Sequence, residues 1–285
     1  MDSFTLTRLL SELGNWHAAV AKAFDAADDH PTVGSKAWNE LQSSPAPVFV
    51  RTAYSQGMIL IEVAADLFTS FTRSLTEPVL TIAPWIEARS LIEASAIAAW
   101  LLDPAIDAAE RVGRSFAFRI RGLDQEWKFA NAVPNSVPID QLQARIAKVE
   151  KDANSLGYRS FHNDKGRLIG LGQVAPSSTQ LIGMCLGEEG TYRMLSALAH
   201  GHAWALHTLG FRKVGDRPSV FLEKGIEPWA ILFMALKIVQ AFKVPVGHRF
   251  DLFGWDPLEA NRTRDSVLKL IFELNRDADY PLQSE

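Results

Sequence analysis

The sequence predicts an all-α protein: a multi-helix bundle of seven to nine helices with at most one small β-hairpin near residues 158–169. Of the 285 residues, 47% are hydrophobic and 22% are charged, so the chain can bury a large core without a metal or a disulfide. Apolar side chains recur at helical spacing, and the breaks between these segments are short. We expect one helical domain over residues 1–285, with an N-terminal helix and loop in residues 1–47 and the core in residues 48–275.

In the first half of the chain, proline residues mark the breaks between predicted helices. The apolar pattern from Leu6 to Phe24 predicts a first helix. Residues 28–47 contain three prolines and are expected to form a loop with one short helical turn. Asp103 and Pro104 are expected to be the N-cap and the first residue of a later helix. The helices that follow the loop are predicted over residues 48–74, 84–102, 103–132 and 139–156.

In the second half, the sequence Asn-Asp-Lys-Gly at residues 163–166 predicts the turn of the small hairpin. Residues 191–209 are expected to form one continuous helix, which Gly210 ends. Residues 211–224 are expected to be irregular. Further helices are predicted over residues 180–186, 228–242 and 257–275.

Composition limits the classes of protein that this chain can represent. With 29 Lys and Arg against 33 Asp and Glu, the net charge of −4 disfavours nucleic-acid binding over a broad surface. Cys185 has no second cysteine to pair with, so neither an internal disulfide nor a cysteine metal site is expected. The apolar stretch at residues 82–102 contains three charged residues, and that at 229–239 is too short to cross a bilayer. No secretory signal is recognisable, and we expect no membrane partner and a cytoplasmic location.

Familiar catalytic motifs are absent: the sequence has no P-loop, dinucleotide-binding, serine-hydrolase, zinc-protease or CxxC pattern. One segment with unusual polar residues is EARSLIEA, at residues 87–94. Arg89 and Glu93 are four residues apart in a helix that is otherwise apolar, so they lie on one face. They form either an internal ion pair that fixes the packing of this helix or the polar wall of a pocket.

The second segment is YRMLSALAHG, at residues 192–201. Arg193, Ser196 and His200 share one helical stripe, which Tyr192 flanks. An arginine and a histidine on one face can hold a phosphate and exchange protons near neutral pH. The alternative is that His200 donates to a carbonyl group or to Glu93 within the core. The predicted catalytic residues are Arg193 and His200, and the predicted binding residues are Arg89, Glu93, Tyr192 and Ser196.

No metal site and no cofactor are expected. On an ideal helix His200 and His202 point about 200° apart, and His207 aligns poorly with both, so the three do not converge on one ion. The mixed-charge stretch at residues 107–121 is expected to be a solvated face. Trp100 and Trp204 are candidates for lining a pocket.

Together, the two polar segments resemble a pattern in uncharacterised helical bacterial proteins, in which an RxxxE helix precedes a YRxxSxxxHG helix. The similarity covers residues 48–209. More loosely, the chain is similar to the HEPN superfamily, which consists of helical bundles that often dimerise and include ribonucleases with an R-x(4–6)-H motif. Arg193 and His200 are separated by six residues, although Met194 stands where that family usually has a polar residue. This resemblance implies that Arg193 positions a phosphate, that His200 acts as acid or base, and that the protein is a homodimer.

Three hypotheses about function follow. The first is a HEPN-like module that cleaves RNA or binds a nucleotide in a local cleft, in defence or stress. The second is a non-catalytic structural or interaction protein with a buried Arg–Glu–His network. The third is a small-molecule binder with a pocket between helices.

Overall fold

The computed structural model describes residues 2–28, 30–133, 138–214 and 221–277, which form eleven helices and five short strands. The predicted all-α class is confirmed, but the predicted number of helices was wrong. The helices are α1 (Ser3–Ala26), α2 (Lys36–Ser43), α3 (Pro47–Ser74), α4 (Ala83–Leu101), α5 (Ala108–Ala132), α6 (Ile139–Ser155), α7 (Ser178–Leu186), α8 (Glu189–Ala199), α9 (Ala203–Leu209), α10 (Pro228–Phe253) and α11 (Leu258–Asp277). The strands are β1 (Ser160–His162), β2 (Leu168–Leu171), β3 (Gln173–Val174), β4 (Phe211–Val214) and β5 (Phe221–Lys224).

Short local signals account for the additional helices. In the predicted N-terminal loop, the Ser35 hydroxyl accepts a hydrogen bond from the backbone N–H of Trp38 at 3.2 Å and so caps α2. The predicted helix over residues 191–209 is two helices, because Gly201 adopts a left-handed φ of 73° and ends α8. The predicted start of α5 at Asp103 was also wrong. Its N-cap is Asp107, which accepts a hydrogen bond from Glu110 N–H at 2.8 Å.

The β-structure exceeds the single predicted hairpin. Strands β1 and β2 form the hairpin expected near residues 158–169, but β3 adds a third antiparallel strand after a tight turn at Gly172. A second antiparallel hairpin, β4–β5, occupies the region that we expected to be irregular. In both places the strands have two to four residues, too few to show a clear period-2 pattern in the sequence.

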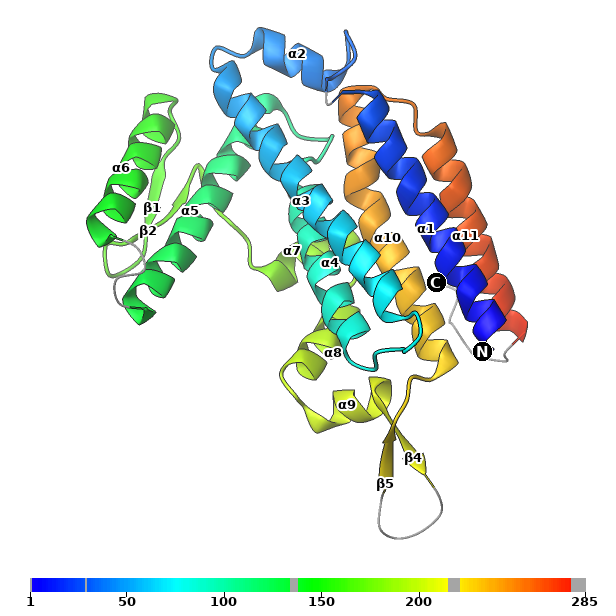
Figure 1. Cartoon of the computed structure of the whole chain (residues 1–285). Coiled ribbons are helices and arrows are strands. Elements are labelled where there is room, and N and C mark those ends of the chain that lie inside the picture. The colour runs from blue at the N-terminus through cyan, green and yellow to red at the C-terminus, as the bar shows by residue number, and fades with distance from the viewer. Residues whose placement is uncertain (1, 29, 134–137, 215–220, 278–285) are drawn as a thin grey trace.

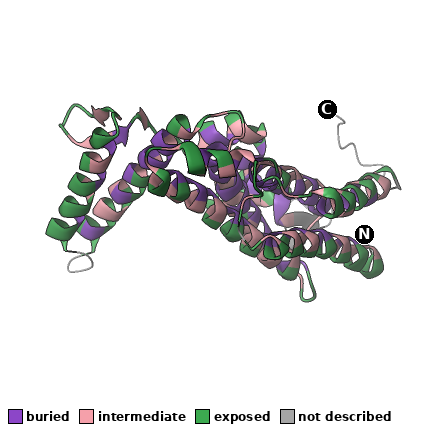
Figure 2. Cartoon of the chain, turned by 90° about the horizontal axis from the view of Figure 1, so that it is seen from above, coloured by how far each residue is buried: buried purple, intermediate pink, exposed green. Residues whose placement is uncertain are grey.

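The centre of the bundle is α4, which packs against α3 on one side and α10 on the other, while α1 pairs with α11 (Figure 1). Apolar residues nearly all round α4 predict this central position, and its residues from Ala94 to Leu101 are all buried. One cluster of buried hydrophobic side chains runs from Leu9 in α1 to Ile271 in α11. The lobe formed by α5, α6 and the sheet β1–β3 projects from the side of this bundle (Figures 1 and 2).

Helix α10 is longer than predicted. It continues past Phe242 to Phe253 and includes Pro245, whose ring is buried inside the helix. Within the described ranges, α10 is the one helix long and apolar enough to cross a membrane, and 67% of its most apolar stretch is buried inside the protein. The core helix of a bundle passes the same test, so this property does not distinguish the two situations.

A buried ion pair joins the lobe to the bundle, in a stretch that we expected to be solvated. The Arg111 side chain is 0% exposed, and its Nε donates to the Glu40 carboxylate in α2 at 3.0 Å. Its Nη1 donates to the carbonyl oxygen of Leu101 at 2.9 Å, near the end of α4. Tyr54 of α3 also donates to Glu40, at 2.7 Å. One guanidinium group therefore connects four helices.

Removing the carboxylate of this pair is expected to be costly. Glu40→Ala leaves a buried guanidinium without its counter-charge, and the free energy of unfolding should fall by about 3–5 kcal/mol. Urea unfolding followed by circular dichroism measures the loss. The matched control is Arg145→Ala, which breaks an exposed ion pair with Glu126 and should cost less than about 1 kcal/mol. Equal losses in the two variants would contradict the central role of Glu40.

Stability should also fall on mild acidification, because two histidines are half-buried against the core. His17 stacks on Phe68, and burial lowers its pKa, with a smaller opposing effect from Glu62. Burial likewise lowers the pKa of His248, whose Nδ1 lies 3.2 Å from the carbonyl oxygen of Ala99. The unfolded chain, with histidine pKa values near 6.5, then binds more protons than the folded chain. The free energy of unfolding is therefore expected to decrease as the pH falls below about 6.5. His17→Phe should reduce this dependence, as measured by urea unfolding at pH 7.5 and 5.5.

Candidate functional site

Three of the predicted site residues meet where α4 packs against α8. Arg89 Nη2 donates to the Tyr192 hydroxyl at 3.0 Å, and that hydroxyl donates to Glu93 Oε2 at 3.2 Å. The Arg89 guanidinium lies 5.1 Å from the centre of the Tyr192 ring and 3.8 Å from the Glu93 carboxylate. The structure therefore brings Arg89, Glu93 and Tyr192 into contact, and we call these three residues the α4–α8 network.

Two residues that sequence analysis did not single out extend the α4–α8 network. Ser178, the first residue of α7, donates to Glu93 Oε1 at 2.6 Å. Arg121 of α5 donates to the Ser178 hydroxyl at 2.7 Å and to the carbonyl oxygen of Pro176 at 2.8 Å. The neighbouring Ser177 is the N-cap of α7. No local pattern, however, indicates that Ser178 contacts a carboxylate 85 residues away.

The α4–α8 network is half-buried, which determines its electrostatics. The side chains of Arg89 and Glu93 are 25% and 29% exposed, so both charges keep partial contact with solvent. Tyr192 is buried, and this burial raises the pKa of its hydroxyl; the Glu93 carboxylate adds to the increase and Arg89 opposes it. The Tyr192 hydroxyl is therefore protonated at neutral pH and serves as a fixed donor to Glu93, not as a base.

The two predicted catalytic residues, Arg193 and His200, are not brought together. Arg193 is 68% exposed and forms an ion pair with Glu189 at 2.7 Å, one turn toward the N-terminus of α8. His200 lies on the other side of Arg193, about 10 Å along the helix axis. The Arg193 guanidinium therefore points away from His200. The exposed His200 side chain makes no hydrogen bond or ion pair with the residues that the structure describes.

The chain reverses direction directly after His200. Gly201 N–H donates to the carbonyl of Leu198, and His202 N–H donates to the carbonyl of Ala197, both at 2.9 Å. This pair of hydrogen bonds, with a left-handed glycine, is a Schellman motif. His200 is therefore the C-cap residue of α8, not the middle of a long helix. It also lies outside the α4–α8 network, so the expected Arg–Glu–His network does not form.

An exposed segment links α8 to α9. Residues 200–204 are all exposed, and the segment includes two histidines and Trp204, whose side chain is 55% exposed. Neither Trp204 nor the buried Trp100 is among the residues that line the four best-defined hollows. Ser196, the remaining predicted binding residue, is half-buried, and its carbonyl accepts a hydrogen bond from His200 N–H at 3.0 Å. Arg193, His200 and Trp204 are thus each exposed, at successive points from α8 into α9, and these three residues are here called the α8 end.

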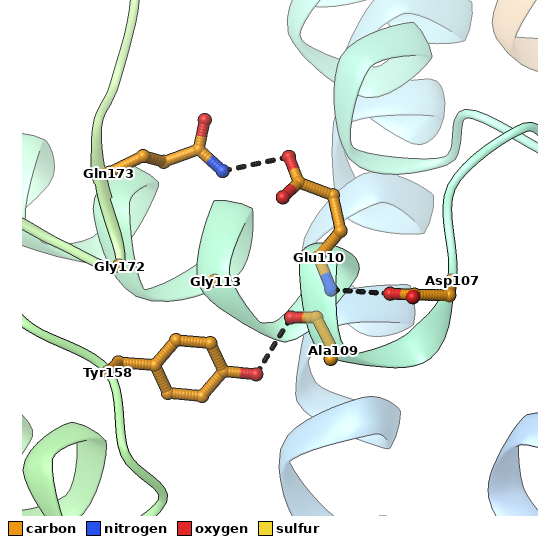
Figure 3. A pocket seen from close by; sticks show the side chains of 7 residues that line it. All are labelled: Asp107, Ala109, Glu110, Gly113, Tyr158, Gly172 and Gln173. Carbon is orange, nitrogen blue, oxygen red and sulfur yellow. Dashed lines mark hydrogen bonds between the residues drawn. The ribbon is translucent and has the colours of Figure 1, made fainter.

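The four best-defined hollows of the described surface lie outside both the α4–α8 network and the α8 end. One hollow of about 430 Å³ lies beside the start of α5, where the sheet packs against it, and Asp107 and Glu110 line it together with Tyr158, which donates to the carbonyl of Ala109 at 2.7 Å (Figure 3). Burial raises the pKa of Tyr158, and the two carboxylates add to the increase. None of the four best-defined hollows of the described surface is lined by any of the six predicted site residues.

Neither metal ligands nor known relatives assign a role to these residues. Within the described ranges, no three His, Cys, Asp or Glu side chains gather as the ligands of a metal ion would. In comparisons with family models, curated proteins and solved structures, nothing matches this chain.

The contribution of the α4–α8 network to stability can be measured by removing a single hydroxyl group. Tyr192→Phe removes the group that bridges Arg89 and Glu93, and the free energy of unfolding should fall by about 1 kcal/mol. The loss is expected at the low end for a hydrogen bond to a charged group, because both charges reach solvent. Ser196→Ala, one turn along α8, is the matched control and should change stability by less than about 0.5 kcal/mol. A Tyr192→Phe protein as stable as the wild type would show that the bridge does not hold the helices.

Proposed function

We propose that this chain binds RNA through the α8 end and that the α4–α8 network holds this surface in place. The observation that carries the proposal is the difference in solvent exposure between Tyr192 and the residues that follow it. Tyr192 is buried and tied to α4, whereas the neighbouring Arg193 and the following His200 and Trp204 are exposed.

The three exposed side chains have the chemistry that single-stranded RNA requires. Arginine binds phosphate oxygens through paired N–H donors. An exposed tryptophan offers a flat face on which a base can stack. Histidine exchanges protons near neutral pH. The ion pair of Arg193 with Glu189 is solvent-exposed and worth less than about 1 kcal/mol, so the guanidinium can turn to a phosphate at little cost.

Cleavage is the further step that the HEPN-like pattern implies. In such a reaction His200 takes the proton of a ribose 2′-hydroxyl, and the 2′-oxygen attacks the adjacent phosphorus. The bond to the 5′-oxygen breaks, a 2′,3′-cyclic phosphate forms, and the leaving oxygen takes up a proton. Because Arg193 points away from His200 within one chain, the pair is completed either by rotation of Arg193 or by the α8 end of a second copy in a homodimer.

A second candidate function is a non-catalytic helical interaction protein. The observation that favours it is that Arg193 is paired with Glu189 and that both oxygens of the Glu93 carboxylate accept hydrogen bonds from groups of the protein itself. In this case the network only fixes α4 against α7 and α8. His200 and Trp204 would then be ordinary surface residues.

Variants of the α8 end distinguish these two functions. Wild-type protein is mixed with a fluorescent single-stranded RNA, and binding and cleavage are measured separately. Trp204→Ala should weaken binding about tenfold by removing the stacking face. His200→Ala should slow cleavage at least about 100-fold and leave binding nearly unchanged. His162→Ala, which removes an exposed histidine in β1, is the matched control and should behave like the wild type.

The results separate the alternatives clearly. If the wild type neither binds nor cuts RNA, the second candidate function is favoured. If RNA is bound but His200→Ala cuts it as fast as the wild type, His200 is not the acid or base. Sedimentation of the same samples reports whether the active species is a dimer.

A further inference from the structure

A second hollow, separate from the α8 end, is lined by residues of α5, of the β1–β2 hairpin and of the segment that follows β3. Its volume is about 320 Å³. Its polar lining comes from three positively charged side chains, one carboxylate and one amide. The residues that line it are Ile120, Arg121, Asp124, Lys128, Asn163, Arg167, Ile169 and Ala175.

The charges in this hollow are not balanced. Asp124 accepts from Lys128 at 2.7 Å and from Arg167 at 2.5 Å, so two cations share one carboxylate. Arg121 donates only to neutral oxygens, those of Pro176 and Ser178. The lining therefore carries two more positive than negative charges.

The two arginines are held in position before any ligand arrives. The Arg167 guanidinium lies 4.1 Å from the centre of the Trp127 ring, which supports its flat face. Its backbone N–H donates to Asn163 Oδ1 at 3.0 Å, which fixes the turn that carries it. Arg121 is held by its two hydrogen bonds to the segment that leads into α7. Cations that are already oriented lose less entropy on binding an anion.

The surrounding sequence strengthens this positive potential. Residues 108–180 contain eleven Lys and Arg against seven Asp and Glu, whereas the whole chain has a net charge of −4. The rest of the chain is therefore strongly acidic. An anion that approaches the protein is steered toward the lobe, because like charge repels it from the remaining surface.

From these observations we infer that the hollow binds a phosphate group, carried by a nucleotide or by an RNA backbone. Arginine donors match the oxygens of phosphate in pairs, and Lys128 adds a charge at the rim. Since Asn163 Oδ1 already accepts two backbone N–H groups, its amide nitrogen is the part with hydrogen bonds to offer. This site does not depend on the function proposed for the α8 end.

Titration calorimetry with sodium pyrophosphate, in buffer with 50 mM salt, tests the inference. Arg167→Gln and Lys128→Gln should each weaken binding at least about tenfold, since each removes a charged hydrogen bond. Arg145→Gln is the matched control: it removes one positive charge from an exposed position on α6 in the same lobe and should change affinity less than about twofold. Lys128 is more than half exposed, so its variant should fold normally and keep the test interpretable if Arg167→Gln loses stability.

Two competition experiments identify the kind of molecule that carries the phosphate. Competition of pyrophosphate by ADP points to a nucleotide, and competition by single-stranded RNA points to a nucleic-acid backbone. His200→Ala and Trp204→Ala should leave pyrophosphate binding unchanged, which separates this site from the α8 end. The inference is overturned if the wild type does not bind pyrophosphate, or if Arg145→Gln weakens binding as much as the other two variants.

Discussion

The burial of α4 is the constraint on which the rest of the structure depends. In a helix that is covered on nearly all sides, polar groups are stabilised when they find partners within the protein. The Glu87 carboxylate accepts from two serines of α3, and Glu93 accepts from α7 and α8. Near its C-terminus, Arg111 and Arg114 of α5 donate to the last carbonyl groups. Each neighbour of α4 is thus placed by a polar contact as well as by apolar packing.

Much of this core could be predicted from the sequence, because apolar residues nearly all round α4 indicate a helix that is buried on most sides. The α4–α8 network was also predictable in outline, since an Arg–Glu pair four residues apart in an apolar helix needs partners. The identity of those partners was only partly predictable. Tyr192 lay in the second polar segment, but Ser178 and Arg121 came from elements that no local pattern connects to α4.

The errors arose where local and tertiary information conflict. Arg111 lies in a mixed-charge stretch that has the composition of a surface, and it is buried only because α2 places Glu40 against it. Conversely, His200 lies in a helical pattern but ends the helix, because the left-handed φ of Gly201 outweighs the periodicity that continues beyond it. The helical stripe that suggested Arg193 and His200 as a catalytic pair assumed a helix that continues past His200. In the structure His200 is the C-cap of α8.

Net charge was a poor guide to where an anion can bind. The acidic total conceals a basic lobe and an acidic bundle, so an argument from the average charge excludes less than it suggests. The α4–α8 network lies between these two regions, with Arg121 reaching from the lobe to the bundle through Ser178. The segment entering α7 is therefore shared by the half-buried network and by the cationic hollow.

Two glycines set how closely the lobe's sheet approaches α5. A Cβ atom at Gly172 would lie 2.9 Å from the Tyr158 ring and 3.4 Å from the Cα of Gly113 on α5. The two backbones thus meet with no side chain between them, and they do so two helical turns before Arg121. A methyl group at Gly172 would meet the Tyr158 ring and the backbone of α5 at these distances, so the ring or the sheet would have to shift. The close approach of the sheet to the helix that carries Arg121 therefore depends on two residues that have no side chain at all.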